Sequence, residues 1–177
     1  DITDKKHIET ELQRLATTDG LTQSSNRRHF FDCAHREFEQ ARKQGEPLSF
    51  LLLDIDDFKV INDTYGHQVG DSVLQRIAES GRASLRRGDV FGRIGGEEFA
   101  AVFPGCAPDM AMQVAERLHR EIQRLGFCHD DQTFGITISQ GLTSLTAEDA
   151  NIDALFARAD AAMYEAKRQG KNRIICG

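Results

Sequence analysis

Residues 90–103 read VFGRIGGEEFAAVF, in which two apolar segments, Val90–Ile94 and Phe99–Phe103, are separated by Gly-Gly-Glu-Glu. Short apolar segments on either side of a glycine-containing turn are typical of a β-hairpin. Glycine suits such a turn because it accepts the positive φ that tight turns require. The stretch therefore predicts a hairpin whose tip carries the adjacent carboxylates of Glu97 and Glu98, with backbone that a ligand can approach closely.

A second acidic group ends another apolar run. Ser49–Asp56 is almost wholly apolar until Asp54, and this pattern predicts a buried central strand. Carboxylates at the end of a strand can hold a hard cation such as Mg2+, which takes oxygen ligands and leaves positions for substrate phosphates. The alternative is that Asp54, Asp56 and Asp57 are ordinary solvated residues. If the hairpin pairs beside this strand, two carboxylate groups converge on one sheet edge, as metal-assisted nucleotidyl transfer requires.

Helical and strand patterns alternate over the rest of the chain. Apolar spacing predicts helices over residues 1–18, from about 29 to 45, over about 70–85, from 110 to 125 and from 152 to 166, and strands within 133–145 and 172–176. The fold class expected is α/β (α+β), with a central mixed, mostly antiparallel sheet flanked by helices. The helix faces expected to be buried contain Phe30, Phe31, Ala34, Phe38, Ala41, Val73, Leu74, Ile77, Leu85, Met110, Val114, Leu118, Ile122, Leu125, Ile152, Leu155, Phe156, Ala159, Met163 and Ala166.

The composition is that of one globular domain. The 177 residues are 40% hydrophobic and 28% charged, and their formal net charge is −6. An acidic chain lacks the basic face that nucleic acid polymers require, so neither non-specific nucleic-acid binding nor a polymerase-like template channel is expected. The longest apolar run, Phe50–Leu53, is too short to cross a bilayer, so no membrane contact is expected. No signal peptide is visible, which favours a cytoplasmic domain. The sequence begins without Met and reads as a piece of a longer protein, which could be anchored to a membrane upstream.

Four cysteines, Cys33, Cys106, Cys128 and Cys176, show no CxxC pair and no metal-ligand spacing. Their even number allows two disulfides, but a domain without a secretory signal favours reduced thiols. We expect free and mostly buried cysteines.

The N-terminal residues 1–18 carry a short apolar seam. Ile8, Leu12 and Leu15 follow a four-then-three spacing. The seam fits either a helix packed on its own domain or the end of a coiled coil that enters from an upstream domain. The sequence leaves both open.

Several sequence motifs, which occur in a characteristic order along the chain, together resemble those of one family. Residues 17–177 resemble the GGDEF family, the diguanylate cyclases, in its GGEEF form. The resemblance implies a palm-like nucleotidyl cyclase domain over residues 19–177, preceded by a linker helix over 1–18. The start, Asp1-Ile2-Thr3, also resembles the end of a PAS sensor. The matching motifs are Gly95-Gly96-Glu97-Glu98-Phe99, Asp19-Gly20-Leu21-Thr22, Asn26-Arg27-Arg28, Asp54-Ile55-Asp56-Asp57-Phe58-Lys59, Asn62-Asp63, Tyr65-Gly66-His67, Gly70-Asp71, Ala159-Asp160, Ala162-Met163-Tyr164, Ala166-Lys167 and Gly170-Lys171-Asn172.

This resemblance implies an activity and its partners. Two GTP molecules would be joined into cyclic di-GMP with loss of two pyrophosphates. The reaction would depend on Mg2+, with Mn2+ as the alternative ion, and on a homodimer in which two domains meet face to face. Cyclic di-GMP would also act as an inhibitor at a separate site.

The resemblance also implies residue roles. The metal ligands would be Asp54, Glu97 and the carbonyl of Ile55, and the catalytic residues Glu97, Lys59 and Glu98. GTP would contact Phe58, Asn62, His67, Asp71, Lys167 and Lys171, and the inhibitory RxxD site would contain Arg86, Asp89 and Arg117. Taken alone, several of these residues have ordinary explanations. Asp71 would be a helix N-cap, Lys59 a solvated lysine, and Lys167 and Lys171 an exposed face one helical turn apart.

Two departures from the family pattern stand out. Gln23-Ser24-Ser25 replaces a Gly-Leu-type stretch, so the local turn need not form as in the family. Lys171 replaces a more common arginine, which keeps the charge but loses bidentate geometry. There are two alternatives to a diguanylate cyclase. One is a catalytically silent receptor for GTP or cyclic di-GMP, and the other is a cyclase that accepts purine bases other than guanine. The presence of Asp54, Glu97 and Glu98 favours an active enzyme, and Asp71 favours guanine.

Overall fold

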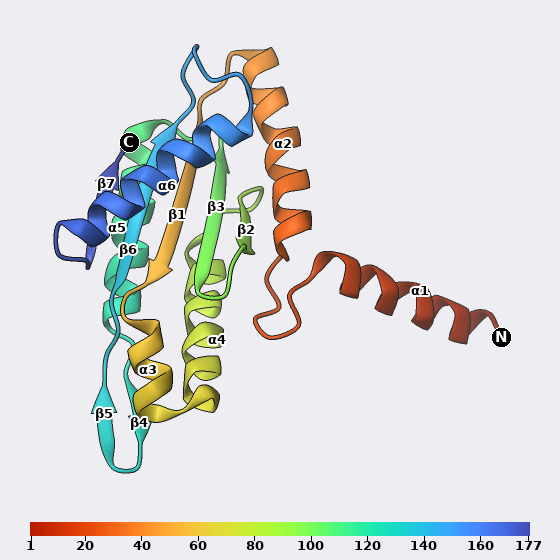
Figure 1. The fold of residues 1–177 in the computed structure, drawn as a ribbon. Coiled ribbons are helices and arrows are strands. Elements are labelled where there is room, and N and C mark those ends of the chain that lie inside the picture. The colour runs from red at the N-terminus through yellow and green to blue at the C-terminus, as the bar shows by residue number, and fades with distance from the viewer.

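The computed structural model, which describes all 177 residues, contains seven strands and six helices (Figure 1). The helices are α1 (Ile2–Thr17), α2 (Arg27–Gln44), α3 (Phe58–Tyr65), α4 (His67–Ser84), α5 (Pro108–Gln123) and α6 (Ile152–Arg168). The strands are β1 (Leu48–Ile55), β2 (Val90–Arg93), β3 (Glu98–Pro104), β4 (Phe127–His129), β5 (Gln132–Phe134), β6 (Ile138–Ser144) and β7 (Arg173–Cys176).

The centre of the fold is a five-stranded sheet in the order β2-β3-β1-β6-β7. Every pair is antiparallel except β6 with β7. All eight residues of the middle strand β1 are buried, because it has neighbours on both edges and helices on both faces. The mixed, mostly antiparallel sheet predicted from the sequence is confirmed, as are the hairpin of β2 with β3 and the buried strand β1.

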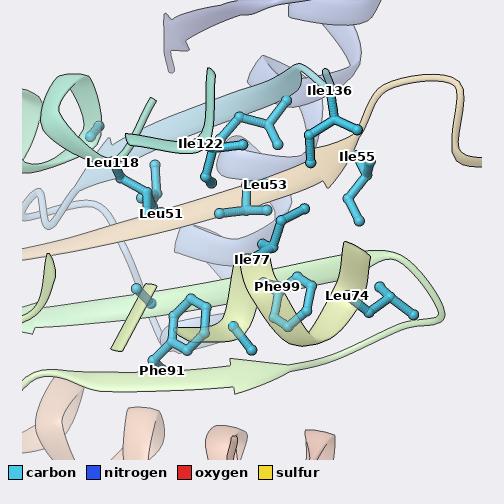
Figure 2. Packing of buried hydrophobic residues seen from close by; sticks show 14 of the residues in the cluster. Leu51, Leu53, Ile55, Leu74, Ile77, Phe91, Phe99, Leu118, Ile122 and Ile136 are labelled. Carbon is cyan, nitrogen blue, oxygen red and sulfur yellow. The ribbon is translucent and has the colours of Figure 1, made fainter. Parts of the chain in front are cut away.

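Side chains alternate between the two faces of the sheet and build two apolar clusters. Leu51, Leu53 and Ile55 of β1 join the cluster beneath α3, α4 and α5. Figure 2 shows Leu53 of β1 in this cluster, together with Ile77 of α4 and Ile122 of α5. Leu48, Phe50 and Leu52 of β1 pack with α2 and α6 on the opposite face. The helices therefore form a layer on each side of the sheet.

The helices expected over residues 29–45 and 152–166 are confirmed. Helix α2 begins at the N-cap Asn26, whose side chain accepts the His29 N–H, and ends at Gly45 with φ of 68°. The helix expected over 110–125 is also present, but one residue of its predicted buried face is wrong. Met110 is 50% exposed, because the buried stripe of α5 begins at Ala111 instead.

The region around residues 58–85 is more structured than predicted. Two helices, α3 and α4, replace the single helix expected over 70–85, and they break at Gly66 with φ of 94°. Leu85 lies just beyond the end of α4 and is half-buried. The segment 133–145 contains β6 and also β5, which forms a separate ribbon with β4. The β4–β5 turn uses positive φ at Asp130 and Asp131, residues that accept this conformation more readily than most.

All four cysteines are free, as predicted, but the expectation that most are buried is wrong. Only Cys106 is buried, whereas Cys128 and Cys176 are exposed. Cys128 lies on the two-stranded ribbon and Cys176 on the edge strand β7, where side chains reach solvent.

Helix α1 has no buried residue and extends away from the body of the domain (Figure 1). Its seam residues Ile8, Leu12 and Leu15 are 61%, 62% and 60% exposed. The interpretation of α1 as a helix packed on its own domain is therefore wrong. None of the six helices combines the length and apolar character needed to cross a bilayer.

The contact of α6 with β6 depends on Gly141. A Cβ at this position would lie 2.1 Å from the Ala159 carbonyl oxygen and 2.6 Å from the Met163 nitrogen, so backbone would have to move. We predict that Gly141→Ala lowers the free energy of unfolding by about 2 kcal/mol in urea denaturation.

The matched control is Gly126→Ala, because a Cβ there has nothing within 4 Å. The control should change the free energy of unfolding by no more than about 0.5 kcal/mol. Equal effects of the two substitutions would contradict the packing argument.

Candidate active site

The carboxylates predicted to converge are brought together by the register of three strands. Asp54 on β1 lies opposite Glu98 on β3 and opposite Ser139 on β6. The Ile55 N–H donates to the Glu97 carbonyl at 3.3 Å, so Glu97 follows on the same edge. Asp54, Glu97 and Glu98 therefore gather at one end of the central sheet.

The turn between β2 and β3 is closed differently from the prediction. Neither Gly95 nor Gly96 has a positive φ. The turn is closed instead by the Ile94 and Gly95 N–H groups, which both donate to the Glu98 carbonyl, at 2.9 and 3.3 Å. A Cβ on Gly95 would come within 3.3 Å of the Glu98 carboxylate, so this glycine gives the Glu98 side chain room.

Asp54 is buried, and one of its carboxylate oxygens lacks a hydrogen-bond partner. The residue is 8% exposed, and its Oδ1 is buried without a hydrogen-bond partner. The nearest cation, Lys167 Nζ on α6, lies 3.4 Å from this oxygen, close enough for an ion pair but without hydrogen-bond geometry. Burial raises the pKa of Asp54 to about 7; Lys167 opposes this shift, and the carboxylates of Glu97 and Glu98 add to it. Burial also raises the pKa of Glu98, with Asp160 and Glu97 contributing.

The donors at this edge suit a hard divalent cation. They are carboxylate and carbonyl oxygens, which Mg2+ and Mn2+ prefer over nitrogen or sulfur. No group of three or more His, Cys, Asp or Glu side chains in the structure is arranged to hold a metal by itself. An ion bound through Asp54 and Glu97 would therefore complete its shell with backbone oxygen, water or the phosphates of a ligand, which is usual for Mg2+.

The neighbouring aspartates have different roles. Asp56 is 4% exposed and its two oxygens accept from Thr137 Oγ1 and Ser139 Oγ, both at 2.6 Å, and from the Asn172 N–H at 3.0 Å. Asp57 has φ of 56° and precedes α3. These three aspartates look alike in the sequence but differ in the fold. Asp54 has a buried oxygen without a hydrogen-bond partner, Asp56 accepts three hydrogen bonds, and Asp57 is exposed.

The two predicted phosphate-binding lysines both lie at this edge, but not on one helix. Lys167 on α6 is 3.4 Å from Asp54 Oδ1 and 3.8 Å from Asp56 Oδ1. The prediction that Lys171 continues the same helical face is wrong, because α6 ends at Arg168 and Lys171 has φ of 66°. Lys171 instead pairs with Asp57 at 2.6 Å.

The residues predicted to read guanine lie on the α3–α4 pair. Asn62 is half-buried, and its Oδ1 is buried without a partner. A Cβ on Gly70 would lie 1.8 Å from this oxygen, so the glycine allows α3 and α4 to approach at Asn62. Phe58 at the start of α3 is buried, while Lys59 beside it is exposed.

Two further predicted contacts lie on α4. Asp71 is exposed and sits inside the helix, and the N-cap position belongs to Gly66. The N-cap explanation for Asp71 is therefore wrong. His67 is the first residue of α4 and is also exposed.

Three residues that hold the hairpin were given no role in the sequence reasoning. Arg93 donates to the Gly96 carbonyl at 2.8 Å and to Asp19 at 3.2 Å. Arg27 at the start of α2 donates to the Ile94 carbonyl at 2.8 Å. Asp19 and Arg27 belong to motifs visible in the sequence, but Asp19 lies 74 residues from Arg93 and Arg27 lies 67 residues from Ile94, so these partners meet only in the fold. Together they fix the turn immediately before Glu97.

The turn at residues 19–25 is intact despite its unusual sequence. The Asp19 N–H donates to the Ser24 carbonyl at 2.7 Å, and Thr22 donates to Asp19 through both its N–H and its hydroxyl. Burial alone would raise the pKa of Asp19, but these bonds and Arg93 lower it. Arg82 also holds the turn by donating to the Thr22 carbonyl at 2.6 Å.

The RxxD residues lie at the opposite end of β2 from the carboxylates. Asp89 accepts from the Arg86 N–H at 2.9 Å and from its guanidinium at 3.1 Å, and this hydrogen-bonded pairing raises the pKa of Arg86. The Asp89 side chain is 1% exposed, whereas that of Arg86 is 45% exposed. Arg117 on α5 donates to the Ser84 carbonyl at the end of α4, two residues before Arg86. A cavity of about 550 Å³ borders this turn, and His29 and Cys33 line it together with Arg86, Arg87 and Asp89.

Comparisons with known proteins agree on one family. A sequence model described as "Diguanylate cyclase, GGDEF domain" matches residues 16–173. The diguanylate cyclase DgcP of Pseudomonas aeruginosa is 39% identical over 168 residues, which cover 95% of this chain and 25% of that protein. A diguanylate cyclase of Vibrio cholerae is 37% identical over 173 residues, which cover 98% of this chain and 53% of that protein.

A solved structure is similar over nearly the whole chain. The coiled coil and GGDEF domain of DgcB from Caulobacter crescentus, in complex with c-di-GMP, matches with a TM-score of 0.93 and 31% identity, covering 99% of this chain and 93% of that one. The chain spans about half or less of the length of the curated relatives.

The raised pKa of Asp54 gives a prediction for stability. An ordinary carboxyl ionises near pH 4 in the unfolded chain, but Asp54 ionises near pH 7 in the folded chain, so the folded state holds the extra proton between these values. This contribution is present below pH 4 and is lost as the pH rises through 7. Without divalent ions, Asp54→Asn should therefore stabilise the protein more at pH 8 than at pH 5, measured by urea denaturation.

Asp63→Asn serves as the control because Asp63 is exposed. Its effect should be the same at both pH values. An Asp54→Asn effect that does not change between pH 5 and pH 8 would contradict the account of Asp54.

Proposed function

The chain belongs to the GGDEF domain family, and from this premise we propose that it is a diguanylate cyclase that condenses two GTP molecules into cyclic di-GMP. The observation that carries the proposal is the convergence of Asp54, Glu97 and Glu98 at one sheet edge, with a buried Asp54 oxygen that has no hydrogen-bond partner. A site of this kind needs a cation and offers oxygen ligands to it. Nucleotide phosphates bring the remaining ligands.

We assign the cation as Mg2+, with Mn2+ as the alternative. Asp54 and Glu97 would hold it through their carboxylates, and Ile55 through its carbonyl. A bound ion would supply positive charge to the phosphates and favour ionisation of the attacking hydroxyl. Lys167, which faces Asp54, has a flexible stem that can also reach phosphates at this edge.

The residues of the chain have separate tasks in the reaction. The 3′-oxygen of each GTP bonds to the α-phosphorus of the other, and the bond from that phosphorus to pyrophosphate breaks, so pyrophosphate leaves with the electron pair. Glu97 accepts the hydroxyl proton, and Glu98 assists it. Lys59 stabilises the charge that develops on the phosphates. Lys167 and Lys171 bind the triphosphate.

Guanine is read by the α3–α4 pair. The unpaired Asn62 Oδ1 accepts an N–H of the base, and the Asp71 carboxylate accepts others. Phe58 and His67 line the same pocket. A buried acceptor without a partner in the protein favours a ligand that donates to it, because leaving it unpaired is costly.

One domain holds one GTP, so catalysis requires a second copy. Two identical half-reactions fit a two-fold dimer. The exposed seam Ile8, Leu12 and Leu15 suits α1 to a coiled coil, and the similar DgcB structure is described as containing one. We assign residues 1–18 as a linker helix that joins a PAS-like upstream sensor to a cyclase domain over 19–177. The domain works in the cytoplasm, where GTP is available.

The RxxD turn is assigned to product inhibition. The Arg86 guanidinium binds phosphate or guanine of cyclic di-GMP, Asp89 accepts from guanine, and Arg117 adds a second guanidinium. Product binding must open the present Arg86–Asp89 pair. The site lies at the far end of β2 from Glu97, so it acts without blocking GTP directly.

We predict that Glu97→Ala lowers the rate of cyclic di-GMP formation below about 1% of wild type, because it removes both a metal ligand and the proton acceptor. The rate is measured by chromatography of GTP reactions. The control Glu148→Ala changes an exposed glutamate and should keep the wild-type rate. Turnover by Glu97→Ala near the wild-type level would remove Glu97 from the site.

We predict that Arg86→Ala raises the cyclic di-GMP concentration needed for half-inhibition by roughly tenfold or more, since it removes charge-assisted contacts. The initial rate without added product should stay close to wild type. The control is Arg120→Ala, an exposed arginine of α5 that does not line the cavity beside Arg86, and it should remain inhibited. If Arg86→Ala is inhibited as strongly as wild type, the inhibitory site lies elsewhere.

A further inference from the structure

The turn that carries Lys171 is held in an uncommon backbone conformation. After α6 ends, Gly170, Lys171 and Asn172 have φ of 123°, 66° and 50°. Two consecutive non-glycine residues with positive φ are costly and persist only where surrounding contacts fix them. One such contact is the Asn172 N–H, which donates to Asp56 at 3.0 Å.

The Lys171 N–H donates to the Ala166 carbonyl at 2.9 Å, and the Arg173 guanidinium donates to the Lys171 carbonyl at 2.9 Å. Helix α5 supplies two further contacts. The Asn172 Oδ1 lies 2.8 Å from His119 Nε2 and 2.9 Å from Gln123 Nε2. Both donors belong to α5, whereas Asp56 follows strand β1. The amide of Asn172 thus ties the Lys171 turn to a helix that is remote in sequence from the proposed site.

The orientation of His119 is itself fixed from the core. Gln140 on β6 is fully buried, and its Nε2 donates to the Ala115 carbonyl at 3.2 Å and lies 3.1 Å from His119 Nδ1. Because this Nε2 is a donor, His119 Nδ1 must accept, and His119 Nε2 must carry the proton that it donates to Asn172.

Gln140 Oε1 is left buried without a partner. An unpaired buried amide oxygen costs stability that an apolar side chain would not. Its presence in the core is explained if the amide is there to orient His119.

We propose that His119, oriented by Gln140, is a positioning residue for GTP: acting through Asn172, it fixes the left-handed turn that presents Lys171 to the triphosphate. The inference rests on the proposed function of Lys171. In the structure the Lys171 ammonium already lies at the carboxylate edge, 2.6 Å from Asp57. Without the α5 contacts the turn can relax, and the ammonium loses its fixed place.

The test compares His119→Leu, His119→Gln and wild type in steady-state GTP turnover with Mg2+. A lysine that contacts the triphosphate equally in the ground state and the transition state strengthens GTP binding without changing the rate of the chemical step. His119→Leu should therefore raise KM for GTP about fivefold and change kcat less than twofold. His119→Gln keeps a donor toward Asn172 and should return KM to within about twofold of wild type. Arg120→Ala, an exposed neighbour on α5, should leave KM unchanged.

A double-mutant cycle with Lys171→Ala separates positioning from general structural damage. In the Lys171→Ala background, His119→Leu should raise KM no further, because the group that it positions is gone. Asn172→Gly keeps the left-handed backbone accessible but removes the amide, and should raise KM as His119→Leu does. An unchanged KM in His119→Leu, or an equal rise in both backgrounds, would overturn the proposal.

Amide hydrogen exchange distinguishes this inference from the proposed function. His119→Leu should speed exchange of the Lys171 and Asn172 amides about fivefold or more relative to Arg120→Ala, whether or not the protein turns over GTP. Unchanged exchange overturns the positioning role of His119. Absence of cyclic di-GMP from the wild-type reaction would instead contradict the proposed function.

Discussion

The antiparallel register of β1 with β3 is the constraint on which the site depends. It places Asp54 directly opposite Glu98 and sets Glu97 beside Ile55. Like charges at opposed positions destabilise a sheet, and burial of Asp54 adds to that cost. The two apolar clusters that sandwich the sheet stabilise this arrangement. The protein therefore holds a negatively charged edge in place before any cation or phosphate arrives.

Other parts of the domain bring lysines to this edge or hold its hairpin in place. Helix α6 brings Lys167, and the turn after it brings Lys171. The hairpin is fixed by Arg93, which joins the Gly96 carbonyl to Asp19 in the turn just after α1. Hydrogen bonds through Asp19 and Arg93 therefore connect the end of α1 to Gly96, the residue before Glu97. Strand β2 links the same hairpin to the Arg86–Asp89 turn, so the proposed catalytic and inhibitory sites share one strand.

Much of the fold and of the candidate site could be predicted from the sequence, because local residue patterns indicate them. Apolar periodicity located β1, the hairpin and helices α2, α5 and α6, and strand-end carboxylates located the edge. The break at Gly66, the β4–β5 ribbon and the turn at Lys171 were missed, since each depends on backbone conformations that apolar spacing does not encode. The family resemblance singled out Asp54, but residue patterns alone could not distinguish it from Asp56. The distinction depends on Thr137, Ser139 and Asn172, which become partners of Asp56 only in the folded sheet.

The most direct test of the central claim is the product formed when the concentrated protein is incubated with GTP and Mg2+, with cyclic di-GMP scavenged to prevent feedback and products read by mass-resolved chromatography. The account predicts cyclic di-GMP and pyrophosphate, with a rate per protein that rises with protein concentration because two domains must meet. Folded protein that binds GTP yet yields no cyclic di-GMP at any concentration would contradict it and favour a silent nucleotide receptor.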